Sequence, residues 1–200
     1  MKHSQIVLYL ASQSPRRRKL IRSLPLSVQL VKSRYEEQSA THLPRQPAAL
    51  ALRHALQKAR HAVLPASPPS HAIVLGADTI VVYRGKVMGK PKNLAEAMAM
   101  LRLLSGKTHR VITGLALLHP ATGRRLTGVG KTKVTFKKMD DGALRRYITA
   151  VCPLDKAGAY AIQEGPKIVK KIEGSRTNVM GLPMELLRIK LQRATVRWFQ

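Results

Sequence analysis

The chain has 200 residues, 44% of them hydrophobic, and carries 36 Lys and Arg against 10 Asp and Glu, a formal net charge of +26. This composition excludes a disordered chain, a single cysteine excludes an internal disulfide or multi-cysteine metal site, and no apolar run approaches the roughly 18–20 residues that cross a bilayer. We expect a cytoplasmic protein whose residues 1–200 form one domain, or two lobes around a central cleft. Its basic surface favours polyanionic partners, including nucleic acid.

The first chemical signal is a helix start that directly follows a short apolar strand, residues 7–11. Ser14 is a good capping residue and precedes Pro15, whose missing N–H costs nothing at the first helical position. Free backbone N–H groups, the hydroxyl of Ser12 and the guanidinium groups of Arg16 and Arg17 converge there, which predicts an anion site. The alternative is a capped basic helix without a ligand.

An adjacent pair of acids, Glu36 and Glu37, follows a second expected strand at 26–31. The pair is either an exposed loop or a source of a metal or water ligand beside the next strand. A helix is expected at 48–63, because its apolar residues recur every three or four positions, with Lys58 off the centre of the apolar stripe.

The central strand is expected at 73–83, a nearly continuous apolar and β-branched run with Asp78 in its middle. A carboxylate in a strand buried on both faces is costly unless it is paired, protonated or bound to a metal. The alternative is an aspartate that caps a turn at a strand end. A hairpin at 83–88 and a turn at 89–91 can return Lys90 toward the end of this strand, where open α/β sheets bind ligands.

The remaining elements continue to alternate. We expect helices at 94–104 and 140–150 and after Pro183, strands at 108–118, 126–139 and 168–172, and a loop at 178–181. Alternating strands and helices predict an α/β fold. The small-residue stretch 155–163 allows close approach of a ligand and contains an acid, a cation and an amide.

Together these stretches resemble the Maf family of nucleoside-triphosphate pyrophosphatases, first named as septum-formation inhibitors. The matching segments are LASQSPRRRKLI (10–21), YEE (35–37), ALQKA (55–59), GADTIVV (76–82), GKP (89–91), MLRLLSGKTHRVITGLAL (100–117), PLDKAGAYAIQ (153–163) and GLP (181–183). The resemblance implies a mixed twisted sheet with helices on both faces and a deep nucleotide-binding cleft. It also implies a homodimer that hydrolyses a nucleoside triphosphate to the monophosphate and pyrophosphate with Mg²⁺ or Mn²⁺.

The resemblance also implies roles for individual residues. Asp78 matches the proton acceptor that activates water, and Glu37 the loop carboxylate that supports the metal beside Asp78, with Glu36 as the weaker candidate. The other matches are Lys58 and Lys90 for phosphate charge, Ser12, Arg16 and Arg17 for the phosphate-binding turn, and Arg16, Thr79 and Gln163 for base selectivity.

Ala-Asp-Thr at 77–79 and Asp-Lys-Ala-Gly-Ala-Tyr at 155–160 resemble the family branch that acts on dTTP, UTP and modified pyrimidine nucleotides, rather than the 7-methyl-GTP branch. Ala161 and the segment 164–166 depart from the family's glycines, which bears on the base pocket more than on the chemistry. The extreme basic charge also departs from the family. It leaves open an alternative function, a nucleic-acid-binding or division-regulating protein with a vestigial cleft.

Overall fold

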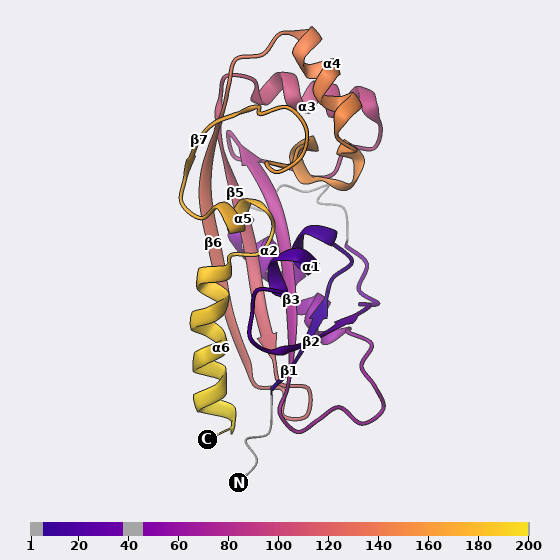
Figure 1. The fold of residues 1–200 in the computed structure, drawn as a ribbon, viewed down its shortest axis with the longest axis vertical. Coiled ribbons are helices and arrows are strands. Elements are labelled where there is room, and N and C mark those ends of the chain that lie inside the picture. Colours follow the sequence, from indigo (N-terminus) through magenta and orange to yellow (C-terminus); the bar gives the residue numbers. More distant parts are fainter. Residues whose placement is uncertain (1–5, 38–45, 200) are drawn as a thin grey trace.

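The computed structural model describes residues 6–37 and 46–199, and in them seven strands form one mixed sheet (Figure 1). The strand order is β2-β1-β3-β5-β6-β7, with β4 paired to β3. β1 (Val7–Ala11) lies parallel to β2 (Ser27–Val31) and to β3 (Ala72–Tyr83). Antiparallel pairing adds β4 (Lys86–Met88), β5 (Thr108–Leu118), β6 (Arg125–Phe136) and β7 (Val169–Glu173). The expected α/β fold with a mixed sheet is confirmed.

Helices cover both faces of this sheet. α2 (Pro47–Arg60) packs so closely on one face that a Cβ at Gly76 or Gly114 would strike its backbone. On the other face, a Cβ at Gly130 would strike Asn178 of α5 (Arg176–Val179), and Gly128 lies against α6 (Met184–Phe199). Glycine is therefore required in β3, β5 and β6 by the helices above and below them.

Three further helices begin after a capping residue, as the sequence predicts for Ser14. α1 (Pro15–Ile21), α3 (Leu94–Leu104) and α4 (Asp141–Ala150) follow Ser14, Asn93 and Asp140, whose side chains accept backbone N–H groups of the first turn. α3 and α4 lie at one end of the sheet with two short 3-10 turns, η1 (Pro153–Asp155) and η2 (Ala157–Ala159), whereas α1 and α6 lie nearer the other end (Figure 1).

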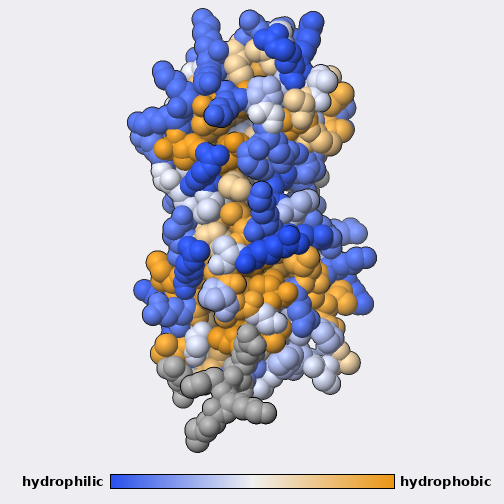
Figure 2. Space-filling view, viewed as in Figure 1, coloured by the Kyte–Doolittle hydropathy of each residue, from blue (hydrophilic) through white to orange (hydrophobic). Residues whose placement is uncertain are grey.

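The hydrophobic core follows the same division. One cluster joins α3 and α4 to the sheet around Leu101, Phe136 and Tyr147, and another joins α1 and α6 to it around Leu10, Ile73 and Leu187. Figure 2 shows hydrophilic residues over much of one face of the molecule, with hydrophobic residues gathered mainly in its lower half. In the described part of the chain, the buried Lys and Arg side chains are those of Arg17 and Lys156.

Three predicted boundaries are wrong for identifiable reasons. Residues 176–179, expected partly as a loop, form the short helix α5, because Ser175 caps it and the Asn178 amide donates to β5 and β6. α2 ends at Arg60 because the following residues, 61–63, hydrogen-bond to 32–34. β6 ends at Phe136 because the next backbone groups bond to the turn after α3.

No helix in residues 6–37 and 46–199 is long and apolar enough to cross a membrane.

Candidate active site

A pocket of about 680 Å³ lies between β3, α1, α2 and the two 3-10 turns. Its lining includes all nine residues for which the sequence predicts a role: Ser12, Arg16, Arg17, Glu37, Lys58, Asp78, Thr79, Lys90 and Gln163. Glu36 is exposed and does not line it. The volume is in the range of small-molecule and cofactor sites, so residues up to 151 positions apart in the sequence share one ligand-sized space.

Where the pocket meets β3, Lys58 bridges two carboxylates. Its Nζ lies 2.7 Å from Asp78 Oδ1 and 2.5 Å from Glu37 Oε1. The side chains of Asp78 and Lys58 are 8% and 13% exposed, whereas that of Glu37 is 42% exposed. We call Glu37, Lys58 and Asp78 the carboxylate–lysine centre.

Two regular elements position this centre. β3 carries Asp78 on the face that α2 covers, and Lys58 lies in the last turn of α2 with its side chain directed at that strand. Burial alone would raise the pKa of Glu37, but the charge and hydrogen bond of Lys58, assisted by Lys90 and His54, hold that pKa below its usual value. The centre therefore keeps its loop carboxylate ionised.

Arg17, which the sequence predicts to contact phosphate, also has a structural role beside the centre. Its guanidinium donates to the carbonyl of Gly181 at 2.7 Å, to Thr79 Oγ1 at 2.9 Å and to Ser12 Oγ at 3.3 Å. The side chain is buried, and burial lowers the pKa of its guanidinium although Asp78 and Glu37 oppose the shift. Arg17 therefore ties the start of α1 to β3 and to the turn at 181 while placing positive charge at the pocket wall.

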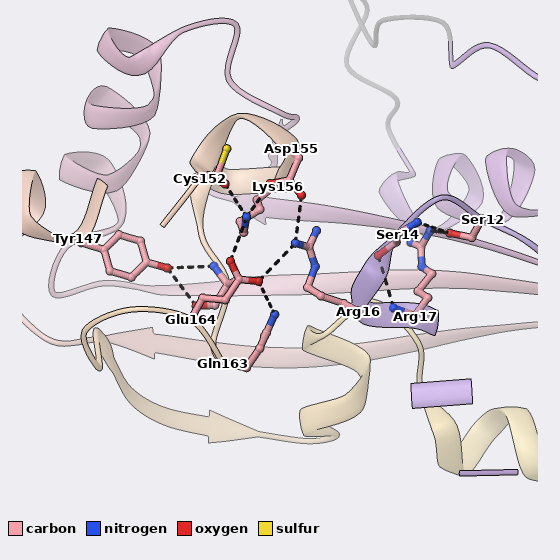
Figure 3. A network of polar contacts seen from close by, with 11 residues as sticks. Ser12, Ser14, Arg16, Arg17, Tyr147, Cys152, Asp155, Lys156, Gln163 and Glu164 are labelled. Atoms are coloured by element: carbon pink, nitrogen blue, oxygen red, sulfur yellow. Dashed lines mark hydrogen bonds and ion pairs between the residues drawn. The ribbon is translucent and has the colours of Figure 1, made fainter. Parts of the chain in front are cut away.

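A second part of the pocket lining is a network of polar side chains that connects α1 to the segment 152–164 (Figure 3). We call Arg16, Asp155, Lys156, Gln163 and Glu164 the cross-cleft network. Arg16 Nη1 lies 3.3 Å from Asp155 Oδ2 and 3.7 Å from Glu164 Oε1, and Lys156 Nζ lies 2.6 Å and 3.1 Å from the same two side chains. Gln163 Nε2 donates to Glu164 Oε1 at 3.0 Å.

Sequence reasoning identified only Arg16 and Gln163 of this network. Its other members lie in or next to the small-residue stretch 155–163, where an acid and a cation were noted without a role. Burial alone would raise the pKa of Asp155, but bonds and charges from Lys156 and Arg16 hold it below its usual value. The network is thus an ionised link across the pocket rather than a set of separate surface charges.

A buried pair beneath the network was also missed. The Tyr160 ring lines the pocket, and its hydroxyl lies 2.8 Å from His109 Nε2 in the core. Burial lowers the pKa of His109 to about 4 and raises the pKa of Tyr160, so at neutral pH the imidazole is neutral and the phenol is protonated. The role of His109 is structural, because it is buried and contacts a pocket-lining residue from the core side.

The donor set of the pocket fits a hard divalent cation only in part. In the described residues no group of three or more His, Cys, Asp and Glu side chains is arranged to hold a metal. Asp78 and Glu37 offer two carboxylates, and Mg²⁺ is commonly held by one or two carboxylates together with substrate phosphates and water. The residues present therefore fit a cation that binds with its substrate, not a preformed protein cage.

Comparisons with known proteins find similarity over nearly the whole chain. Residues 7–194 match the model of the Maf-like protein family. A dTTP/UTP pyrophosphatase of Moorella thermoacetica is 45% identical over 187 residues, covering 91% of this chain and 94% of the relative. Proteins of the same name are 44% identical in Geobacter sp. (92% and 92% covered) and 40% identical in Bacillus cereus (94% and 90% covered). The chain therefore belongs to the Maf family.

Proposed function

We propose that this protein is a hydrolase that cleaves dTTP and UTP between the α and β phosphates, yielding the nucleoside monophosphate and pyrophosphate. The observation that carries this proposal is the carboxylate–lysine centre, a buried acid held by a lysine within a nucleotide-sized pocket. The relatives named dTTP/UTP pyrophosphatases supply the substrate pair.

The reaction needs a base, a leaving group and charge compensation. The oxygen of a water molecule forms a bond to the α-phosphorus as Asp78 accepts the water's proton. The bond from that phosphorus to the bridging oxygen breaks, and pyrophosphate leaves with the electron pair. Lys58, Lys90 and the cations of the α1 turn oppose the negative charge, since positioning and electrostatic stabilisation dominate such hydrolysis.

Asp78 and Glu37 are the residues that would hold Mg²⁺ or Mn²⁺. When bound, such a cation supplies Lewis-acid charge to the phosphate oxygens. Lys58 contacts both carboxylates and holds Asp78 and Glu37 close together. We assign Ser12 and Arg17 to the phosphate side of the pocket.

Base selectivity is assigned to Arg16, Thr79 and Gln163, which also line the pocket. Because Gln163 donates through Nε2 to Glu164, its amide oxygen points away from that carboxylate and suits the N3–H donor of uracil and thymine. Cytosine has an acceptor at this position and is expected to bind less well. Ala161 lines the same pocket, and its backbone N–H donates to the hydroxyl of Tyr147.

A homodimer, the cytoplasmic location, the single domain over residues 1–200 and a link to septum formation remain predictions from the resemblance and the composition. A 7-methyl-GTP substrate is the alternative for the same chemistry. The vestigial-cleft alternative is disfavoured because all the predicted site residues except the weaker candidate, Glu36, line the pocket.

The test is pyrophosphate release with Mg²⁺ or Mn²⁺ from dTTP, UTP, CTP, GTP, 7-methyl-GTP and ATP. We expect turnover of dTTP and UTP, and a loss of about 10²–10⁴-fold in Asp78→Asn because the general base is removed. Asp141→Asn, the same change at an exposed acid paired with Arg102 outside the pocket, is the matched control and should retain full activity. Turnover of 7-methyl-GTP alone would overturn the substrate assignment, and equal rates in wild type and Asp78→Asn would overturn the mechanism.

A further inference from the structure

Four cations that the pocket does not use lie on the face of the sheet that α2 partly covers. They are Arg110 of β5, Lys131 and Lys133 of β6 and Lys171 of β7, and all four are exposed. We call them the basic ladder. Alternation along the strands gives their direction: Gly114 of β5 meets α2, and residues an even number of positions away, such as Arg110, share its face.

Strand register brings the ladder together. Arg110 is directly opposite Lys133, and Lys131 is two positions along the same strand, opposite Ile112. Lys171 is opposite Thr135 on the neighbouring pair. Like charges directly opposite each other in an antiparallel pair reduce sheet stability. The arrangement of Arg110 and Lys133 is therefore unfavourable for the fold alone and gains a purpose if an anion lies above it.

The acids of the chain do little to neutralise this face. Glu173 is opposite Lys133 and contacts Lys171 at 3.2 Å. α2, which covers the rest of the face, contains no acid and adds the exposed residues Arg53 and Arg60. Four of the ten acids lie at the pocket instead, in the carboxylate–lysine centre and the cross-cleft network. The two regions thus differ in charge: cations and acids pair in the pocket, whereas the ladder is mostly unpaired.

We propose that the basic ladder binds the sugar–phosphate backbone of nucleic acid, without reading its sequence. Cations repeated along a strand and across neighbouring strands match a linear polyanion, and backbone neutralisation by Lys and Arg supplies most of non-specific binding. A membrane surface fits less well, since membrane-binding faces pair cations with large exposed apolar residues. The exposed large hydrophobic residues of the described chain do not include any from β5, β6 or β7. Binding here is separate from nucleotide hydrolysis, because none of the four residues lines the pocket.

The test compares two variants of equal net charge. The ladder variant is Arg110→Gln, Lys131→Gln and Lys133→Gln, and the matched control is Lys19→Gln, Arg188→Gln and Arg193→Gln, three exposed cations on α1 and α6. The probes are a 30-base-pair DNA duplex and a 30-nucleotide RNA, each titrated across a range of salt. For DNA we expect the slope of log affinity against log salt to flatten by about 2.7 in the ladder variant, about 0.9 for each lost phosphate contact. The control should keep at least most of the wild-type slope.

Equal losses in both variants would overturn the proposal, because binding would then follow overall charge. No binding of either probe at physiological salt would overturn it as well, as would binding to vesicles with 30% phosphatidylserine but not to nucleic acid. Saturating pyrophosphate should leave the affinity unchanged; competition would place the nucleic acid in the pocket and contradict the assignment. Turnover of dTTP checks that each variant is folded. If the triple variant does not fold, Lys133→Gln alone replaces it, and we expect the slope of log affinity against log salt to flatten by about 0.9. Since binding is read without catalysis, either proposal can fail while the other stands.

Discussion

The two walls of the pocket are built differently. The carboxylate–lysine centre rests on the middle of β3 and the last turn of α2, and its lysine and aspartate are 13% and 8% exposed. The cross-cleft network rests on the first turn of α1, on 3-10 turns and on the segment after them, and Asp155 and Glu164 are 52% and 37% exposed.

Because of this difference, we expect the two walls to differ in how well they tolerate substitution. Removing one partner of a buried ion pair leaves an uncompensated charge and is strongly destabilising, whereas exposed pairs contribute little. The centre therefore fixes the geometry on which the reaction depends. In the network, the carboxylates of Asp155 and Glu164 are exposed and can change with little loss of stability, whereas Lys156 is 4% exposed and needs a partner. Two exposed carboxylates suit a wall that selects among bases.

Lys58→Met should have the largest effect, because it leaves Asp78 and Glu37 facing each other without their shared cation. We expect kcat for dTTP to fall about 10²–10³-fold, the usual loss when one group that stabilises transition-state charge is removed. The free energy of unfolding should fall by about 3–5 kcal/mol, measured by urea titration.

Lys86→Met, on β4 and outside the pocket, is the control for the change of residue type and should behave like wild type. A loss of kcat below tenfold in Lys58→Met would remove the contrast between the two walls, because the buried centre would then be no more demanding than the exposed network.

One residue of the centre, Asp78, could be picked out from the sequence for a physical reason. A carboxylate in an apolar strand is costly, so Asp78 pointed to a site before any partner was known. The helix starts could also be predicted, because the side chains of Ser14, Asn93 and Asp140 accept hydrogen bonds from backbone N–H groups only three positions away. Helix caps and the energetic cost of a buried carboxylate both depend on neighbouring residues, so both can be predicted from the sequence.

The network could not be predicted in the same way. Arg16 and Asp155 are 139 positions apart, and nothing in either local sequence names the other as a partner. Asn178 was placed in a loop, although its amide is buried and bonds to β5 and β6. His109 resembled any other histidine until the fold placed Tyr160 against it. Partners that meet only through the tertiary fold leave no periodic or capping signal.

Acidification should weaken the network wall first, through His109. Its pKa is about 4 in the fold against an ordinary value of 6.5, so the unfolded chain binds the proton more tightly. Its contribution to stability is complete above pH 6.5 and is lost as the pH falls through about 4; the difference corresponds to about 3 kcal/mol. Urea unfolding at pH 7, 5.5 and 4 measures it.

His109→Gln keeps a hydrogen-bonding group near Tyr160 but does not titrate, so its stability should depend less on pH over this range. His61→Gln, at the exposed end of α2, should keep the wild-type pH dependence. If His109→Gln follows the wild-type curve, the buried histidine does not govern the acid sensitivity of this wall.

Asp155→Asn should have the smallest effect and test the contrast most finely. Arg16 loses its nearer carboxylate at 3.3 Å but keeps Glu164 at 3.7 Å, and Lys156 keeps its contacts with Glu164 and with the carbonyl of Cys152. An exposed pair contributes about 0.2–1 kcal/mol, so we expect KM for dTTP to rise about two- to fivefold with kcat nearly unchanged. Steady-state kinetics with dTTP and CTP separate binding from selectivity.

The exposed pair of Arg102 and Asp141 gives this experiment a matched control, because Asp141→Asn removes a similar contact, 2.6 Å long, away from the pocket. A fall in kcat without a rise in KM for Asp155→Asn would contradict the division of labour, because the network would then act in the chemical step. A rise in KM for dTTP that exceeds the rise for CTP would instead extend this division of labour. The network would then hold Arg16 and Gln163 in the positions that distinguish thymine from cytosine. Selectivity would depend on ion pairs weak enough to be altered without damage to the catalytic wall.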